Sequence, residues 1–398
     1  MKVLIFMKES DLRPAGGPAG FCYNIFQEVK RSNIEDIVFL PSDGNKKIKQ
    51  VNFYRKIIKY FPKWFNSAQI AYRRKRDYQK MIDNPEIYDI DFSSYDAIHF
   101  HSTIALFKYR KNLESYKGKI ILTTHSPVPQ HLEVYAELPT KLEKKLYKKF
   151  YSTLDQIDEY AFKKSDYVIF PCEDAEESYS KNWEKYRSIH NDLVQNGKLV
   201  YIPTGIVPKK IVRSRKEIYK EYLLKNGEFL ISYVGRHNAV KGYDLLQQMA
   251  GKLWEKDKDF HFVICGKESP MKGLNDERWT EIGWTNDSQS VIAASDLFVL
   301  PNRETYFDII MLEVLSCGKI VVASRTGGNK YFEKIGVKGV FLYDTIEEAT
   351  KIIEKISNMT VEEREKLELS NREAFNARFT VDKYVDTYLK FLYSIKNR

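Results

Sequence analysis

Two cations follow a buried strand pattern in the second half of the chain. Residues 234–242 read VGRHNAVKG, so Arg236 and Lys241 come directly after an apolar run. A guanidinium offers a planar fork of donors and an ammonium a point charge, and both suit the oxygens of a diphosphate. In open α/β sheets, ligands bind at the carboxyl ends of the strands, where this loop is expected. The alternative is a solvated loop, but Gly235 and Gly242 on either side favour an anion site.

A glutamate lies inside an apolar helical pattern further along the chain. Residues 303–313 read RETYFDIIMLE and follow the buried run near residue 296. A carboxylate at this place can accept hydrogen bonds from both hydroxyls of a ribose, as other nucleotide-binding folds do. Burying it without a partner would be costly, so a purely structural role for Glu313 requires a salt bridge. We expect Glu313 to bind ribose.

A glycine-rich turn follows the first apolar run. Residues 13–20 read RPAGGPAG and precede a helical pattern. Backbone N–H groups at such a junction can approach an anion closely, which makes Gly16 and Gly17 candidate contacts. Tight turns also need glycine for structural reasons. The turn lacks the GxGxxG spacing with an acid about 20 residues later, which argues against an NAD-dependent oxidoreductase.

The segment of residues 46–80 is basic and aromatic. It carries twelve Lys or Arg against one Asp, whereas the whole chain has a net charge of +10. Such a composition suits an anionic bilayer, with rings at the interface and cations on the headgroups. The alternatives are a helix pair whose cations are merely solvated, or nucleic acid, which we do not expect because no recognised nucleic-acid module is present. The residues expected to contact a membrane, or a lipid-linked molecule at its surface, are Lys56, Lys59, Trp64, Phe65, Arg73, Arg74 and Arg76.

Apolar runs alternate with helical stretches and indicate the elements that position these residues. The runs begin near residues 3, 36, 96, 119, 166 and 199, and then near 229, 260, 280, 296, 319 and 339. This alternation is typical of doubly wound parallel sheets. Together with a length of 398 residues, it predicts an α/β fold of two Rossmann-like domains that face a central cleft. Two final helices are expected at about 361–375 and 381–396.

A charged segment, KKIVRSRKE at 209–217, is the expected linker between the domains. The first domain would then comprise residues 1–208 with a C-terminal helix, 380–398, and the second residues 209–379. The chain has no apolar stretch of the roughly 20 residues that span a bilayer. Its N-terminal apolar run is too short for a secretory signal, so a cytoplasmic protein is expected.

Metal and disulfide chemistry are not expected. The four cysteines are far apart, form no CxxC pair and are predicted to be core thiols. The acids Asp89 and Asp91 have the spacing of a metal motif, but they precede a strand instead of ending one. We interpret them as a polar turn and predict no metal cofactor.

Together these motifs resemble the GT-B glycosyltransferases, and family 4 of these enzymes in particular. The most specific part is 296–328, which includes PNRETYFDIIMLEVLSCGKIVVASRTGG. The resemblance implies that Arg236 and Lys241 hold the donor diphosphate, that Glu313 holds the ribose, and that the backbone at Gly283 and Trp284 meets the base. It also implies that His125, in TTHSP, contacts the reacting sugar. The structural alternative for a lone histidine after a strand is a satisfied core residue.

One departure from the family pattern concerns the sugar end of this site. Eight positions before Glu313, where the family has its first glutamate, this chain has Thr305, and Asp308 occupies the usual glycine position. Either Glu304 reaches the donor hexose, or Thr305 and Asp308 make different hydroxyl contacts. The residues expected to bind the donor are Gly16, Gly17, Gly235, Gly283, Trp284, Glu304, Thr305, Tyr306, Phe307, Asp308, Ile309 and Glu313.

The resemblance implies a retaining, metal-independent transfer of a hexose or N-acetylhexosamine from a nucleotide-diphosphate sugar, with UDP expected. His125, Arg236 and Lys241 would be the catalytic residues, and no cofactor is expected. The acceptor would be a saccharide, lipid-linked or on a cell-surface glycan, bound by the first domain, and the protein would work on the inner face of the cell membrane. The alternative is a non-catalytic GT-B-like partner subunit, which the departure at Thr305 supports.

Overall fold

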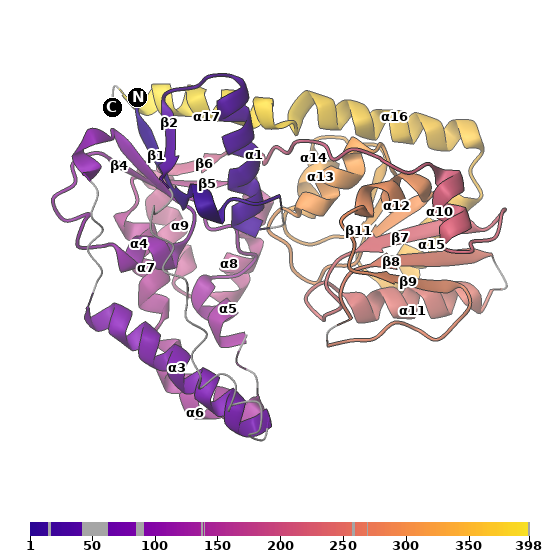
Figure 1. The fold of residues 1–398 in the computed structure, drawn as a ribbon, viewed down its shortest axis with the longest axis horizontal. Helices are drawn as coiled ribbons and strands as arrows, with labels where there is room; N and C mark the ends of the chain where they lie inside the picture. Colours follow the sequence, from indigo (N-terminus) through magenta and orange to yellow (C-terminus); the bar gives the residue numbers. More distant parts are fainter. Residues whose placement is uncertain are drawn as a thin grey trace. The chain divides into compact units, whose positions relative to one another are not determined.

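The computed structural model describes residues 1–14, 17–41, 63–84, 91–136, 138, 140–256, 259–268 and 270–396, with only the backbone of 63–67. Contacts within the chain define two compact units (Figure 1). Unit 1 comprises residues 1–170, 179–200 and 390–398, and unit 2 comprises residues 171–178 and 201–389. The main part of unit 1 therefore ends at residue 200, whereas the sequence suggested 208. The C-terminal segment that belongs to unit 1 begins at residue 390, whereas the sequence suggested 380.

Unit 1 is built on a six-stranded sheet with the order β2-β1-β3-β4-β5-β6. The pairings among its first five strands are parallel. Its strands are β1 (Val3–Lys8), β2 (Ile37–Leu40), β3 (Ala97–Phe100), β4 (Lys119–Leu122), β5 (Tyr167–Phe170) and β6 (Leu199–Tyr201).

Helices follow the strands of unit 1, and polar side chains fix where several of them begin. The side chain of Thr140, for example, accepts a hydrogen bond from the amide of Glu143 at 3.2 Å and so starts α6. The helices are α1 (Gly17–Arg31), α3 (Lys63–Asp83), α4 (Thr103–Lys108), α5 (Gln130–Ala136), α6 (Lys141–Ser152), α7 (Asp155–Lys164), α8 (Glu177–Asn182) and α9 (Tyr186–Gln195). Short 3-10 helices lie at η1 (Glu9–Asp11), η3 (Phe92–Ser94) and η4 (Glu173–Glu176).

Unit 2 repeats this plan with a six-stranded sheet in the order β12-β11-β10-β7-β8-β9, and its pairings are parallel. Ile231, Tyr233, Phe260, Phe262 and Leu297 are at most 1% exposed in its core. Its strands are β7 (Phe229–Val234), β8 (Phe260–Cys265), β9 (Trp279–Gly283), β10 (Leu297–Leu300), β11 (Val321–Ser324) and β12 (Val340–Tyr343).

Capping boxes begin two of the helices of unit 2. Ser214 with Glu217 starts α10, and Thr360 with Glu363 starts α16. The helices are α10 (Arg215–Glu221), α11 (Tyr243–Trp254), α12 (Ser288–Ala294), α13 (Ile309–Ser316), α14 (Asn329–Lys334), α15 (Ile346–Ser357), α16 (Val361–Arg378) and α17 (Val381–Lys396), which ends in unit 1.

The architecture confirms the predicted α/β class. All twelve expected strands form, and α16 and α17 lie where two final helices were predicted. All four cysteines are buried and free, which confirms that they are core thiols. Among the helices that the structure describes, none combines the length and the apolar character that crossing a bilayer requires.

Candidate functional site

The sheet of unit 2 has a switch point between β7 and β10, because the chain runs from β7 toward β9 on one side and from β10 toward β12 on the other. Loops at such a point form the ligand crevice of doubly wound sheets. Here the loops are 235–242 and 301–308, and they touch. The amide of Arg303 donates to the carbonyl of Val240 at 2.9 Å. Its guanidinium donates to Asp244 at 2.7 and 2.6 Å.

Gly242 allows this close approach. Its φ is +64°, and a Cβ atom added there would lie 1.7 Å from the carbonyl oxygen of Pro301. No other residue fits at this position without moving one of the loops. The glycine therefore positions the loop that carries Arg236 and Lys241.

Lys241 is paired in the structure. Its Nζ donates to both carboxylate oxygens of Asp308, at 2.9 and 2.8 Å. The side-chain amide of Asn302 also donates to this carboxylate. Asp308 directly precedes α13 but does not cap it. The cation expected to hold a diphosphate is thus partly neutralised by the residue that departs from the family pattern.

Arg236 lies on the same loop and is exposed. Hydrogen bonds fix the backbone of the loop at this residue. The carbonyl of Arg236 accepts them from the Tyr233 hydroxyl at 3.0 Å and from the Asn238 amide at 2.9 Å. Within the part of the chain that the structure describes, its guanidinium has no ion-pair partner. This charge is available to an anion.

Glu313 is buried, and its carboxylate has a partner. Its Oε1 lies 2.7 Å from Nζ of Lys209, while the glutamate side chain is 10% exposed. The salt bridge that a purely structural role requires is therefore present. Lys209 is itself 45% exposed, so the ammonium is partly hydrated and the pair is open to competition by a ligand.

Gly283 ends β9, and Trp284 follows it with 73% of its surface exposed. The carbonyl of Gly283 accepts a hydrogen bond from the amide of Gly266 at 2.8 Å, which fixes the backbone here. An exposed tryptophan beside a fixed backbone is a suitable surface for a flat base to stack on.

The segment between β10 and α13 turns most of its side chains inward. Thr305, Tyr306 and Phe307 are 1%, 7% and 6% exposed. Their side chains belong to the core, so a donor could reach only their backbone. The hydroxyl of Thr305 lacks a hydrogen-bond partner among the described residues. Glu304 and Ile309 are partly exposed at the two ends of the segment.

In unit 1, His125 follows β4 with a positive φ of 56°. Its Nε2 lies 2.8 Å from Nδ1 of His101, which follows β3, and its ring centroid is 4.6 Å from that of Phe21. Burial lowers the pKa of His125 to about 3. The pKa of His101 is lowered as well, first by burial and then by His99 and His125. His125 is therefore a neutral hydrogen-bonding group near pH 7.

The glycine-rich turn is only partly described. Gly16 lies outside the described residues, whereas Gly17 begins α1 with a φ of +76°. A Cβ atom at Gly17 would meet nothing within 4 Å, so the backbone there faces open space. This is compatible with an anion at the amino end of α1.

The basic stretch is described only from residue 63 onward. Lys56 and Lys59 lie outside the described residues, and Trp64 and Phe65 are placed only by their backbone in α3. On the same helix Arg73 and Arg76 are exposed and Arg74 is partly exposed.

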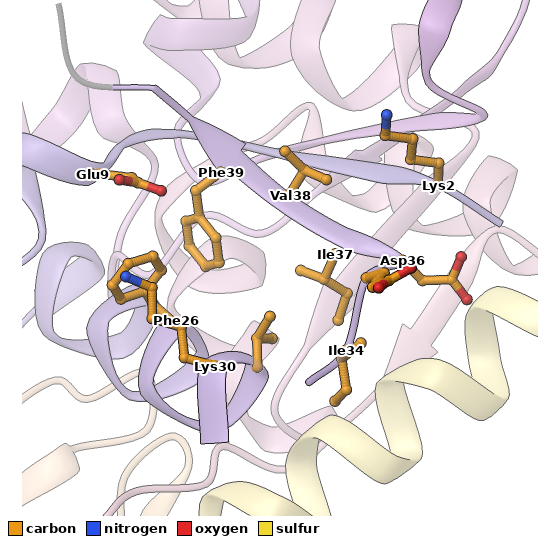
Figure 2. Close-up of a pocket in the computed structure, with 11 residues that line it drawn as sticks. Lys2, Glu9, Phe26, Lys30, Ile34, Asp36, Ile37, Val38 and Phe39 are labelled. Carbon is orange, nitrogen blue, oxygen red and sulfur yellow. The ribbon is translucent and has the colours of Figure 1, made fainter. Parts of the chain in front are cut away.

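A groove of about 670 Å³ lies at the edge of the sheet of unit 1. Figure 2 shows Phe26 and Lys30 of α1 beside Ile37, Val38 and Phe39 of β2. None of the residues that the sequence predicted as functional lines this groove. It therefore adds nothing to the candidate site.

The segment of Asp89 and Asp91, which we interpreted as a polar turn, is a turn where it is described. Asp91 accepts hydrogen bonds from the amide of Ser93 at 2.9 Å and from its hydroxyl at 2.6 Å and so begins η3, whereas Asp89 lies outside the described residues. Among the described residues, no cluster of three or more His, Cys, Asp or Glu has the geometry of a metal site. Metal independence stays a prediction.

Three residues of these arrangements were not predicted from the sequence. His101 could have been found, since it follows one buried strand as His125 follows the neighbouring one, and parallel strands end at the same edge. Lys209 and Asn302 carry no such signal, because only the folded chain brings them to Glu313 and Asp308.

Two Rossmann-like parallel sheets, with phosphate-suited cations at the switch point of the second, define the class of GT-B glycosyltransferase folds. Family comparison agrees with this class. The model of glycosyltransferase family 4 matches residues 15–209, and that of glycosyl transferases group 1 matches residues 228–360. The chain belongs to this glycosyltransferase family.

Relatives and solved structures show how far the similarity extends. A UDP-Gal:α-D-GlcNAc-diphosphoundecaprenol α-1,3-galactosyltransferase of Escherichia coli is 29% identical over 38% of this chain and 43% of its own. A D-inositol 3-phosphate glycosyltransferase of Corynebacterium jeikeium is 29% identical over 29% and 31%. Sucrose-phosphate synthase of Thermosynechococcus elongatus matches 99% of both chains with a TM-score of 0.64 and 15% identity. The matched part thus spans less than half of these two curated relatives, and the structural match shows the fold.

Proposed function

We propose that the protein transfers a sugar from a nucleotide-diphosphate donor to a saccharide acceptor. The observation that carries this proposal is the meeting of the loops after β7 and β10 at the switch point of unit 2. Arg236, which has no ion-pair partner among the described residues, and the ammonium of Lys241 lie on loops that are joined by hydrogen bonds. Fixed cations at such a place suit a diphosphate.

The donor contacts follow from the same unit. Arg236 and Lys241 bind the diphosphate, the ribose hydroxyls replace Lys209 as partners of Glu313, and the base stacks on Trp284. The name of the Escherichia coli relative includes UDP-Gal, which supports UDP as the nucleotide. A hexose or N-acetylhexosamine then lies near the backbone of 304–309.

The chemistry we propose is transfer with retention of anomeric configuration and without a metal. The bond from the anomeric carbon to the diphosphate breaks, and the oxygen of the acceptor hydroxyl forms a new bond to that carbon on the same face. The two cations stabilise the departing diphosphate, and a diphosphate oxygen takes the proton of the acceptor hydroxyl. His125, which is neutral at pH 7, forms a hydrogen bond with the sugar. It does not act as a charged group in the transfer. Removing one such cation costs on the order of a hundredfold in rate.

The acceptor we propose is a saccharide on a lipid diphosphate at the inner face of the cell membrane. The acceptor in the name of the Escherichia coli relative is a diphosphoundecaprenol glycan, and the basic stretch of unit 1 suits such a place. The inositol phosphate acceptor of the second relative is the water-soluble alternative.

A second candidate is a non-catalytic partner subunit. The observation that favours it is that Lys241 and Glu313 are both already paired within the protein, with Asp308 and Lys209. In this case the ion pairs are structural, and nucleotide-sugar binding is lost.

A transfer assay tests the proposal. Purified protein is incubated with radiolabelled UDP-sugars and either an undecaprenyl-diphosphate sugar or an inositol phosphate. We expect label in the lipid product, at the same rate with and without EDTA. Transfer only to inositol phosphate would overturn the lipid acceptor, and a rate abolished by EDTA and restored by Mn²⁺ would overturn metal independence. No transfer of any sugar, together with no nucleotide binding, would favour the partner subunit.

A further inference from the structure

The helix α6 of unit 1 has two different apolar faces. One face packs inward, where Tyr151 is 1% exposed and Tyr147 and Phe150 lie against the same core cluster. Leu142 and Leu146 lie on the other side and are each 66% exposed. They are four positions apart, so they neighbour each other on the helix surface. The helix therefore presents an apolar ridge that no described residue covers.

Lysines flank one side of this ridge. At 100° per residue, Lys145 and Lys149 lie within about 60° of Leu142, and Lys141 and Lys148 border them. All four lysines are exposed. The one acid of the helix, Glu143, is buried on the other side. The outer face of α6 thus carries leucines and cations and no anion.

The neighbouring helix α3 is also basic and carries an exposed apolar side chain. The two helices contact one another, and Figure 1 shows them side by side at the end of unit 1. Ile70 on α3 is 47% exposed, and Arg73, three positions later and so its neighbour on the helix surface, is exposed. Together α3 and α6 contain eleven Lys or Arg against three Asp or Glu.

The composition of this surface favours a bilayer over a protein partner. Lysine is depleted from the centres of protein interfaces, where its desolvation is unfavourable. Leucines interleaved with lysines are typical of helices that lie in a bilayer interface, with side-chain stems in the acyl boundary and ammonium groups among anionic headgroups.

We infer that α6, with the adjoining face of α3, docks on an anionic phospholipid bilayer, and that Leu142 and Leu146 insert into it. This goes beyond the proposed lipid-linked acceptor and the basic residues expected before α6. The inference rests on the proposed function only for the biological purpose of membrane binding. The surface would hold unit 1 where a lipid-linked acceptor is available.

Sedimentation with vesicles tests this inference without nucleotide or acceptor, so its outcome is independent of the proposed transfer. We expect the protein to bind vesicles of phosphatidylcholine with one third phosphatidylglycerol, and to bind pure phosphatidylcholine at least tenfold more weakly. The double variant Leu142→Ser/Leu146→Ser should bind the anionic vesicles about tenfold or more weakly, since its apolar contact is lost. Raising the salt concentration should weaken binding of the unmodified protein.

A matched control lies in unit 2. Val361 and Leu369 on α16 are each 58% exposed, so the variant Val361→Ser/Leu369→Ser removes similar exposed apolar surface and should bind vesicles as the unmodified protein does. Because all four residues are exposed, both variants should keep the thermal midpoint. Equal vesicle binding by the Leu142/Leu146 variant would overturn the inference. A dimer, seen by light scattering, that this variant abolishes would also overturn the inference, because the surface would then bind a second copy of the chain instead of a bilayer.

Discussion

At the residue scale, the two side chains best suited to a donor already have partners of opposite charge. Nζ of Lys241 lies 2.8 Å from Oδ2 of Asp308, and Oε1 of Glu313 lies 2.7 Å from Nζ of Lys209. Ion pairs that are partly open to water contribute about 0–1 kcal/mol. A diphosphate and a ribose that bring several hydrogen bonds at once can therefore replace both partners. In the proposed function, these pairs hold the two side chains in place until the donor binds.

Asp308→Asn should strengthen nucleotide binding. The substitution removes the negative charge that competes for Lys241 and keeps a similar side-chain volume. From the strength of partly exposed pairs, we expect about two- to fivefold tighter binding of UDP in a calorimetric titration.

Asp244→Asn is the control for this variant. Asp244 pairs with Arg303 on the neighbouring loop at 2.6 Å, and the variant removes one acid without freeing Lys241. It should leave UDP affinity unchanged. Weaker UDP-sugar binding by Asp308→Asn with unchanged UDP binding would instead mean that Asp308 holds the sugar.

The sequence predicted parts of these arrangements. The apolar neighbours of Glu313 showed that a structural role needs a salt bridge, and the structure has one. Its partner, Lys209, is 104 positions away in the chain, and no local pattern connects the two. The same holds for Lys241 and Asp308, which are 67 positions apart.

At the element scale, neutral histidines lie in β3 and in the segment that follows β4. Burial lowers the pKa of His99 and of His125 to about 3, from an ordinary value near 6.5. In the unfolded chain these rings are protonated below about pH 6.5, whereas in the folded chain they stay neutral. The stability they contribute is complete above pH 6.5 and is lost as the pH falls toward 3.

We therefore expect the end of this sheet to open more easily in mild acid. Each such histidine lowers the free energy of unfolding by up to about 1.4 kcal/mol per pH unit below its unfolded pKa. Hydrogen exchange, corrected for the intrinsic rate, should show protection of β3 and β4 falling by about 1–3 kcal/mol between pH 7.5 and 5.5.

Strand β10 of unit 2, which contains no histidine, serves as the internal reference. Peptides covering β10 should lose less protection over the same range, and His101→Gln should reduce the loss at β3. Equal losses in β4 and β10, with no effect of His101→Gln, would mean that these histidines do not govern the response.

Elements were the part of the structure that the sequence predicted best. Buried parallel strands are continuous apolar runs, so β1 and β7 could be located from composition alone. The same rule places His125 and Arg236 at strand ends. It does not reveal that Tyr306 and Phe307 turn inward, because their direction depends on the core that they meet in the folded chain.

At the scale of the whole molecule, the chain consists of two units with equivalent sheets and belongs to one glycosyltransferase family. Length and repeated strand patterns predicted this plan. The boundary at residue 200 was harder to predict from the sequence, because the chain passes from unit 1 to unit 2 there without a marked change in composition. The two units also divide the proposed work, with the donor in unit 2 and the bilayer at α3 and α6 of unit 1.

The central claim is that the switch point of unit 2 binds a nucleotide diphosphate, and calorimetric titration with UDP and GDP tests it most directly. We predict that the unmodified protein binds one of them. Arg236→Ala and Glu313→Gln should weaken that binding at least tenfold, whereas Lys209→Met should bind as tightly or more tightly. If Glu313→Gln and Lys209→Met lower the thermal midpoint equally and neither changes nucleotide binding, or if no nucleotide binds at all, the claim is contradicted.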